Sequence, residues 1–303
     1  MPLLETKQSL CNHIMTENKT VKLYLQLKDH SVSGEEFGLI YNSELDMLET
    51  FPRPSEEKLS DYYESDDYIS HTDSKRNLLE IVYQKVKSIS LKRKLSLIDS
   101  FSLEGRNLLD LGCGTGDFLK TAKEHGWEIT GIEPNQTARN LANQKTENSV
   151  FDSAELPNLP NQSFDIITLW HVLEHLPNLE NHLSIFKSLL KPNGSLVVAV
   201  PNFKSYDAQY YKSHWAAYDV PRHLWHFSKA SISKLVNKQH MVLEKTLPLT
   251  FDAYYVSLLS EKYKNGFMNP IKAFWTAWRS NFAARKTGEF SSLIYIIKNQ
   301  IPK

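Results

Sequence analysis

The sequence predicts an α/β fold: a doubly wound, mostly parallel seven-stranded sheet with a small β-rich region on its N-terminal side. Three observations support this prediction. Apolar runs of strand length alternate with helical segments from residue 107 onward. A glycine-rich turn joins the first run to the helix after it. Residues before 76 show period-two alternation broken by turn residues, which is typical of short antiparallel strands.

Seven apolar runs are the candidate strands of the large sheet: residues 107–111, 128–132, 149–151, 164–170, 195–200, 241–247 and 291–297. Helices are expected at residues 118–125, 136–143, 179–190 and 228–240. The turn Lys191-Pro192-Asn193-Gly194 ends the helix that precedes the fifth strand. Such strand–helix alternation favours a parallel sheet with helices on both faces.

The chain divides into two expected regions. Residues 1–75 form the small β-rich region, with strands at 21–27, 36–41 and 46–50. Residues 76–303 form the main domain, with a first helix inside residues 77–101 and a helical insert near residues 266–288. The insert is amphipathic and aromatic, so we interpret it as a lid or a subunit contact. A membrane-surface helix is another interpretation, against which its polar face is only mildly basic.

Composition limits the possible partners and compartment. The 35 basic and 35 acidic residues cancel, so the net charge indicates neither nucleic acid nor an anionic membrane. Glu5, Lys7 and Asn12 interrupt the N-terminus where a secretory signal needs an apolar core, and no window has the roughly 20 apolar residues of a membrane span. The cysteines Cys11 and Cys113 fit a reducing compartment. We therefore expect a soluble cytoplasmic protein, a monomer or homodimer that does not bind nucleic acid.

The run Leu-Leu-Asp-Leu-Gly-Cys-Gly-Thr-Gly, residues 108–116, is the most informative stretch. Its glycines, Gly112, Gly114 and Gly116, are spaced one residue tighter than the G-x-G-x-x-G of dinucleotide-binding proteins. Asp110 precedes the turn. Glu133 ends the second strand, 21 residues after Gly112, where a carboxylate can accept hydrogen bonds from ribose hydroxyls. A nucleotide-containing cofactor is therefore expected at this edge of the sheet.

With Gly-Ile-Glu-Pro at 131–134 and Phe-Asp-Ile-Ile at 164–167 followed by Val-Leu-Glu-His-Leu at 172–176, this run resembles the class I S-adenosylmethionine-dependent methyltransferases. The resemblance is strong over residues 108–200. It implies a Rossmann-like methyltransferase fold, S-adenosylmethionine as the cofactor, and methyl transfer to a hydroxyl, amine or carbon of a small-molecule substrate. The competing interpretations are an NAD-dependent oxidoreductase and a non-catalytic S-adenosylmethionine-binding protein.

The resemblance also implies which residues bind the cofactor. The three glycines line its methionyl and ribose portion, Glu133 holds the ribose hydroxyls, and His171 lies beside its amino-acid end. Residues 152–154 flank the adenine, where the choice between Asp152 and Ser153 for the amino group stays open. A nucleophilic role for Cys113 is disfavoured, because methyl transfer needs no thiol. The full expected set is Asp110, Gly112, Cys113, Gly114, Gly116, Glu133, Pro134, Asp152, Ser153, Ala154 and His171.

The aromatic, polar segment at residues 214–228 follows the fifth strand, so it is expected to overhang the cofactor's methyl group. In one interpretation Arg222 pairs with a substrate carboxylate or phosphate, and His223 or His175 takes a proton from the acceptor. In the other, Asp219 and Arg222 form an internal pair that braces the loop. The candidate catalytic residues are His175, Asp219, Arg222 and His223.

Metal sites are not expected. The His-x-x-Glu-His pattern at 171–175 matches a zinc peptidase class, but it directly follows a strand and Pro177 interrupts any helix. Methyltransferases like the ubiquinone-pathway O-methylating enzymes carry an acid–acid–histidine version that holds metal, whereas this chain has His171 first.

The N-terminal region resembles a zinc ribbon without its cysteine pairs, leaving Cys11 alone. We expect a metal-free cover over the substrate. Residues 68–71 either close over the cofactor or form a loop with packed tyrosines that leads into the first helix.

Overall fold

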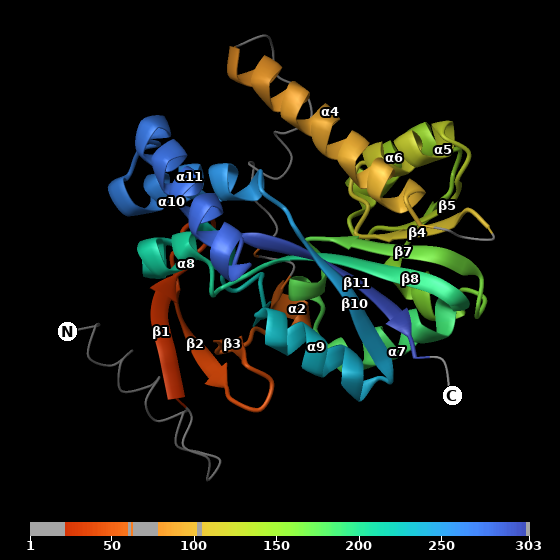
Figure 1. Ribbon diagram of the computed structural model, residues 1–303, viewed down its shortest axis with the longest axis horizontal. Helices are drawn as coiled ribbons and strands as arrows, with labels where there is room; N and C mark the ends of the chain where they lie inside the picture. The colour runs from red at the N-terminus through yellow and green to blue at the C-terminus, as the bar shows by residue number, and fades with distance from the viewer. Residues whose placement is uncertain (1–21, 60–61, 63–77, 102–104, 301–303) are drawn as a thin grey trace.

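The computed structural model describes residues 22–59, 62, 78–101 and 105–300. A seven-stranded sheet in the order β10-β11-β8-β7-β4-β5-β6 runs through the centre of the molecule (Figure 1). Its strands are β4 (Asn107–Leu111), β5 (Glu128–Ile132), β6 (Val150–Phe151), β7 (Phe164–Trp170), β8 (Leu190–Pro201), β10 (Met241–Pro248) and β11 (Ser292–Asn299). The strands β4 to β8 are mutually parallel, and β11 is antiparallel to both of its neighbours. The predicted mostly parallel seven-stranded sheet is confirmed.

Helices cover both faces of this sheet. In Figure 1, α4 (Leu78–Asp99), α5 (Asp117–Glu124) and α6 (Gln136–Thr146) lie above it, and α7 (Leu179–Leu189) and α9 (Lys229–Lys238) lie below. Neighbouring strand residues point to opposite sides: Val197 packs with the upper hydrophobic cluster and Val198 with the lower one. A strand that is buried on both faces has a nearly continuous apolar sequence. The strands of the large sheet could therefore be predicted from their apolar runs.

Side-chain caps explain where the helices begin. The Asn135 side chain accepts a hydrogen bond from the Ala138 amide at the start of α6. Asn178 does the same at the start of α7, and Ser228 forms a capping box with Ser231 at the start of α9. Each cap satisfies an amide that has no partner within its helix.

The strand β8 begins earlier than predicted. Residues 191–194 were expected to form a turn, but β8 starts at Leu190, which pairs with Phe164. A side chain at Gly194 would lie 3.0 Å from the Phe164 carbonyl oxygen. Glycine therefore allows the two backbones to approach. Residues 191–194 form a bulge without strand-pairing partners on β7, and the pairing resumes at Ser195, opposite Ile166.

The smaller sheet combines distant parts of the chain. Its strands, in the order β1-β2-β3-β9, are β1 (Lys22–Lys28), β2 (Glu36–Asn42), β3 (Met47–Phe51) and β9 (Trp225–His226). A short helix, α2 (Glu56–Leu59), follows β3. The predicted N-terminal strands are present, and one hydrophobic cluster joins Leu39 and Leu48 to Trp215 and Tyr218. The division at residue 75 remains a prediction, because β9 comes from beyond it.

Further helices lie beside the small sheet, to the left of the large sheet in Figure 1: α8 (Tyr206–Tyr211), α10 (Asp252–Asn265) and α11 (Pro270–Thr287). Four single-turn to two-turn 3-10 helices complete the description: η3 (Ser153–Asn158), η4 (Leu173–His175), η5 (Lys212–His214) and η6 (Ala216–Tyr218). Among the described residues, no helix combines the length and the apolar character needed to cross a bilayer. Cys11 and the predicted lid at 68–71 lie outside the described residues.

Candidate functional site

The glycine turn lies at the carboxyl end of β4, where parallel α/β sheets bind their ligands. All three glycines have positive φ, at 65°, 55° and 76°. A side chain at Gly112 would lie 2.5 Å from the Val172 side chain, and one at Gly116 would lie 2.9 Å from Ala142. At Gly114, by contrast, a Cβ would meet nothing of the described chain within 4 Å. Two glycines therefore allow close packing, and the middle one faces open space that a ligand can occupy.

Glu133 lies next to this open space, directly after β5. Its side chain is buried, and its two oxygens accept hydrogen bonds from the amides of Gly114 (2.8 Å) and Asn135 (2.9 Å). Burial raises the pKa of Glu133, although these two amides oppose the shift. The carboxylate is thus held rigidly against the turn.

Two further groups lie at the turn: Asp110 is buried, and Cys113 is partly buried. Asp110 accepts a hydrogen bond from the Thr168 hydroxyl (2.6 Å), and burial raises its pKa to about 7 against the opposing effects of Thr168 and Lys94. Burial, together with the carboxylates of Asp110 and Glu133, raises the pKa of the Cys113 thiol far above its usual range. A thiol held protonated is a poor nucleophile, in agreement with the role predicted for Cys113.

Asp152 begins the segment predicted to flank an adenine ring. One carboxylate oxygen accepts hydrogen bonds from the Ala154 amide (3.0 Å) and the Ser153 hydroxyl (3.3 Å), so Asp152 caps η3. The other oxygen forms an ion pair with Arg139 (3.0 Å). The Asp152 side chain stays about half exposed, with a side-chain exposure of 46%. Residues 152–154 therefore form one preorganised turn.

Arg139 is a site residue that the sequence did not indicate. Its guanidinium donates hydrogen bonds to the carbonyl oxygens of Glu133 (2.6 Å) and Pro134 (2.9 Å) while it pairs with Asp152. It thereby joins the loops after β5 and β6. Its only sequence signal is its position, within the second turn of the helix that follows Glu133.

His171 directly follows β7 and has a positive φ of 58°, which is uncommon for a residue other than glycine. Its Nε2 lies 2.7 Å from Asp252 at the start of α10, and its Nδ1 lies 3.4 Å from Glu174. Burial lowers the pKa of His171, but the carboxylates of Asp252 and Glu174 outweigh it and raise the pKa to about 10. A charged imidazolium therefore lies between two carboxylates. The sequence did not indicate Asp252, because α10 is far from β7 along the chain.

Asp219 and Arg222 form the internal pair that was one of the two interpretations of this loop. Arg222 donates to both Asp219 oxygens, from Nε at 2.9 Å and from Nη2. Its remaining donors reach the Tyr62 carbonyl oxygen (3.0 Å) and the Ser31 hydroxyl. The pair braces the loop against the small sheet, and the predicted contact between Arg222 and a substrate remains a prediction.

The imidazole rings of His175 and His223 contact each other, with ring centroids 4.6 Å apart. Their Nδ1 atoms lie 3.0 and 2.9 Å from the carbonyl oxygens of Arg222 and Ala217, so Nδ1 carries the proton and Nε2 keeps a lone pair in each neutral ring. Burial first, and then His223, lowers the pKa of His175 to about 4. Both rings are therefore oriented by backbone contacts.

Glu174 completes this cluster. Its carboxylate is fully buried and accepts no hydrogen bond from the described residues. Burial would raise the pKa of Glu174, but the neighbouring His171 and His223 lower it. Ligand atoms of Glu174, His175 and His223 lie within 4.8 Å of one another, and two imidazoles with a carboxylate are a set that zinc uses. The prediction that the chain holds no metal stays untested.

The small sheet contacts the segment that carries His223 and His226, which we call the histidine loop. The Thr50 hydroxyl, on β3, donates a hydrogen bond to the His223 carbonyl oxygen (2.6 Å) and lies 3.0 Å from His226 Nε2. The Thr50 amide also bonds to the carbonyl oxygen of Leu224 (3.0 Å). This support was missed, because the strand pairing joins residues that are far apart in the sequence.

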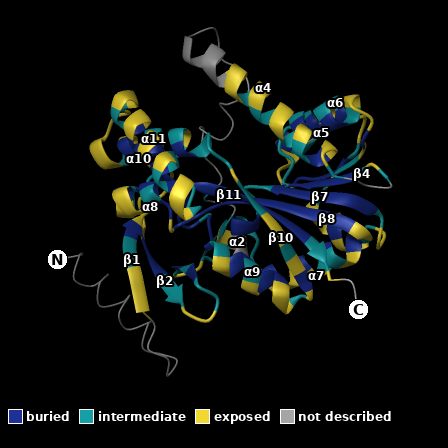
Figure 2. Ribbon diagram, in the orientation of Figure 1, coloured by how far each residue is buried: buried dark blue, intermediate teal, exposed yellow. Residues whose placement is uncertain are grey.

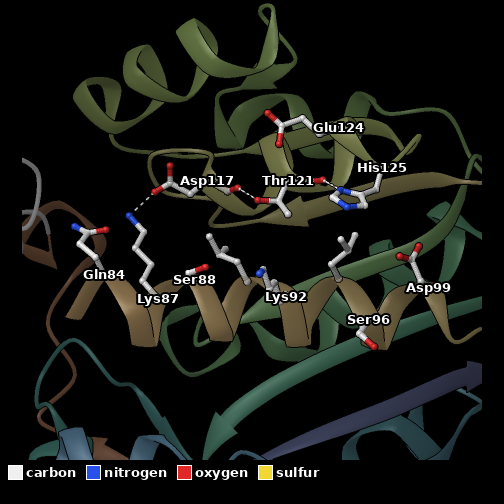
Figure 3. Close-up of a pocket in the computed structure, with 12 residues that line it drawn as sticks. Gln84, Lys87, Ser88, Lys92, Ser96, Asp99, Asp117, Thr121, Glu124 and His125 are labelled. Carbon is white, nitrogen blue, oxygen red and sulfur yellow. Dashed lines mark hydrogen bonds and ion pairs between the residues drawn. The ribbon is translucent and has the colours of Figure 1, made fainter. Parts of the chain in front are cut away.

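A groove of about 630 Å³ runs between α4 and α5 (Figure 3). Asp117 at one end pairs with Lys87 (2.6 Å), and His125 lies farther along α5. The glycine turn, Glu133 and the histidine cluster do not line this groove. The groove is therefore distinct from the site at the strand ends.

The fold and the glycine turn define a methyltransferase-type α/β protein, and comparison with known families agrees. A family model described as "Methyltransferase domain" matches residues 75–240, more than half of the chain. The chain therefore belongs to the methyltransferase family, as its motifs predicted. Membership of this family argues against the NAD-dependent oxidoreductase.

Individual relatives match over shorter stretches. A ubiquinone biosynthesis O-methyltransferase of Coxiella burnetii is 33% identical over 113 residues, which are 35% of this chain and 48% of the relative. Its counterpart in Rhodopseudomonas palustris is 27% identical over 161 residues, covering 50% of this chain and 64% of the relative. In its match to Coxiella, the chain spans about half the length of the curated relative.

Solved structures share the fold. Magnesium protoporphyrin IX methyltransferase from Synechocystis, solved with bound SAH, superposes with a TM-score of 0.53 at 14% identity, covering 81% of this chain and all of that one (100%). A complex of the Haloferax volcanii Trm112 activator with a methyltransferase gives a TM-score of 0.52 at 15% identity, covering 70% of this chain and 89% of that one. At such identities the likeness concerns the fold alone.

Proposed function

We propose that this chain is an S-adenosylmethionine-dependent methyltransferase that methylates a hydroxyl group of a small molecule. One observation carries the proposal: open space at Gly114 lies beside the buried Glu133 carboxylate, 2.8 Å from the Gly114 amide. Each carboxylate oxygen of Glu133 has two lone pairs, and among the described residues each oxygen accepts one hydrogen bond. The remaining lone pairs suit the two ribose hydroxyls of a nucleoside cofactor.

The other proposed cofactor contacts lie at the carboxyl ends of the neighbouring strands. The turn at Asp152, Ser153 and Ala154 borders the adenine, and its exposed carboxylate suits an amino group. Arg139 holds that turn at a constant distance from Glu133. His171, with Asp252 and Glu174 on either side, marks the amino-acid end of the cofactor.

The bound cofactor supplies an already activated methyl group on a sulfonium, so the protein's task is alignment and proton removal. A hydroxyl acceptor favours a base, and the names of the curated relatives favour oxygen as the acceptor atom. His175 and His223 are the candidate bases because backbone contacts at Nδ1, made by carbonyl oxygens of the loop that follows β8, orient both rings. The Glu174 carboxylate stabilises the imidazolium that forms when either one takes the proton. Asp219 and Arg222 position the loop.

Calorimetry with S-adenosylhomocysteine tests the cofactor site. We expect Glu133→Gln to weaken binding about tenfold or more, because a hydrogen bond to a charged acceptor contributes about 1.5–3 kcal/mol. Glu128→Gln, on an exposed position of the same strand, is the matched control and should bind as the wild type does. Equal affinity of the two variants would remove Glu133 from the ribose role.

Turnover measurements test the base. We expect the Asn variant of the true base, His175→Asn or His223→Asn, to lose about 100-fold or more in turnover while still binding S-adenosylhomocysteine. Release of S-adenosylhomocysteine is measured with hydroxylated, amino and sugar-nucleotide acceptors. Cofactor binding without release from any acceptor would favour the non-catalytic binding protein.

Chelation separates proton transfer from metal chemistry at the same cluster. We expect dialysis against a strong chelator to leave turnover unchanged, because the two histidines act as bases. Loss of turnover that zinc restores would instead assign Glu174, His175 and His223 to a metal.

A further inference from the structure

The helix α11 buries its small side chains and exposes its large apolar ones, the opposite of most surface helices. The face it buries is made of small residues: Ala273, Thr276, Ala277, Ser280 and Ala284. The face it leaves exposed carries large apolar side chains: Ile271, Phe274, Trp275, Trp278 and Phe282, each between 44% and 74% exposed. Figure 2 shows exposed positions repeating along this helix. A surface helix normally buries its large apolar residues, so this face is built for a partner.

The exposed side chains form one continuous surface. Ring centroids of Trp275 and Trp278 lie 5.6 Å apart, and those of Trp278 and Phe282 lie 5.5 Å apart in a stacked arrangement. The loop before α11 adds Phe267 and Met268, exposed by 62% and 47%. We call this surface the aromatic face; it consists of Phe267, Met268, Ile271, Phe274, Trp275, Trp278 and Phe282.

Basic side chains accompany the aromatic face. Residues 252–288 contain six lysines and arginines but only two acidic residues, and both acids are already engaged. Asp252 pairs with His171, and Glu261 is buried against Tyr211. The exposed charges on these two helices are therefore cationic: Lys262, Lys264, Arg279, Arg285 and Lys286.

We propose that the aromatic face docks on the surface of a membrane that contains anionic phospholipid. Tryptophan and phenylalanine favour the boundary between headgroups and acyl chains, while surrounding lysines and arginines bind anionic headgroups. A second copy of the chain fits less well. A two-fold contact would set the same cationic side chains against each other without a carboxylate to compensate them.

Docking would also orient the site. The helix α10 starts at Asp252, which bonds to His171 at the end of β7 (2.7 Å). The helices that carry the aromatic face therefore adjoin the carboxyl ends of the parallel strands. An acceptor dissolved in the membrane would reach these strand ends without crossing bulk water. The docking itself depends only on the surface and is independent of the proposed methyl transfer.

Vesicle flotation with the full chain tests the proposal. We expect co-flotation with vesicles of phosphatidylcholine plus phosphatidylglycerol, weakened by salt, and little with phosphatidylcholine alone. The double variant Trp275→Ser/Trp278→Ser should lose about tenfold or more in vesicle affinity. Val242→Ser removes an exposed apolar residue on β10 and should bind as the wild type does.

Two further measurements complete the test. Tryptophan fluorescence should shift to shorter wavelength on addition of anionic vesicles, and the double variant should lose that shift. Absence of vesicle binding, or equal binding by the double variant, would overturn the proposal. Sedimentation of the free chain as a dimer, with the double variant monomeric, would overturn it in favour of a second copy.

Discussion

At the residue scale, ion pairs and hydrogen bonds between charged side chains fix the geometry of the candidate site. His171 lies between Asp252 and Glu174, Arg139 between Asp152 and two backbone oxygens, and Arg222 against Asp219. Each contact fixes a loop at a strand end. The charges therefore preorganise the site before any ligand arrives.

The charge on His171 predicts a pH dependence of stability. Because folding raises its pKa from 6.5 to about 10, His171 stabilises the fold fully below about pH 6.5, and this contribution disappears as pH rises toward 10. The difference in free energy of unfolding between wild type and His171→Gln should therefore shrink over that range in urea titrations. A difference between the two proteins that stays constant from pH 6.5 to 10 would contradict the assignment.

At the scale of elements, a strand of the small sheet supports the histidine loop. Thr50 on β3 bonds to the His223 carbonyl oxygen and to His226, and the β3–β9 pairing continues this contact. The small sheet therefore contacts the segment of His223 and His226 directly, and among the described residues the hydrogen bonds of Thr50 do not extend to the glycine turn.

Removal of the Thr50 hydroxyl tests this support. Thr50→Val should destabilise the fold by about 1–3 kcal/mol, because the buried His223 carbonyl oxygen loses its donor. We expect turnover to fall while the dissociation constant of S-adenosylhomocysteine stays unchanged. Thr246→Val on β10 is the matched control. Weaker cofactor binding by Thr50→Val would show that β3 acts on the cofactor and not on the loop.

At the scale of the whole molecule, Asp207 joins segments from across the chain. This fully buried carboxylate accepts hydrogen bonds from Trp215 (2.8 Å), Ser280 on α11 (2.7 Å) and Ser291 before β11 (2.6 Å). Its bond to Ser280 holds the small-residue face of α11 toward the core, on the side opposite the aromatic face.

Asp207→Ala should therefore destabilise the protein by about 3 kcal/mol or more, since buried donors on three segments lose their acceptor. Urea denaturation measures this change. Ser280→Ala removes only one of the three donors and should cost about 1 kcal/mol. A similar loss for both variants would mean that Asp207 does not connect the three segments.

The sequence predicted most of the fold because strands buried on both faces and amphipathic helices leave periodic patterns. It also indicated Gly114 and Glu133 as candidate site residues, because both follow the carboxyl ends of strands. The contacts of Asp252 and Thr50 could not be predicted from the sequence, because only tertiary packing brings their partners near. The periodicity of α11 indicated an amphipathic helix, but only the structure shows that its small residues form the buried face.

The pairing of β3 with β9 has a consequence for folding during synthesis. Thr50 leaves the ribosome 173 residues before its partner His223. Until then, the outer edge of β3 presents unpaired amides and carbonyls, which can template pairing with other chains. The nascent chain therefore passes through a long interval in which a chaperone bound at residues 47–51 would protect it from aggregation.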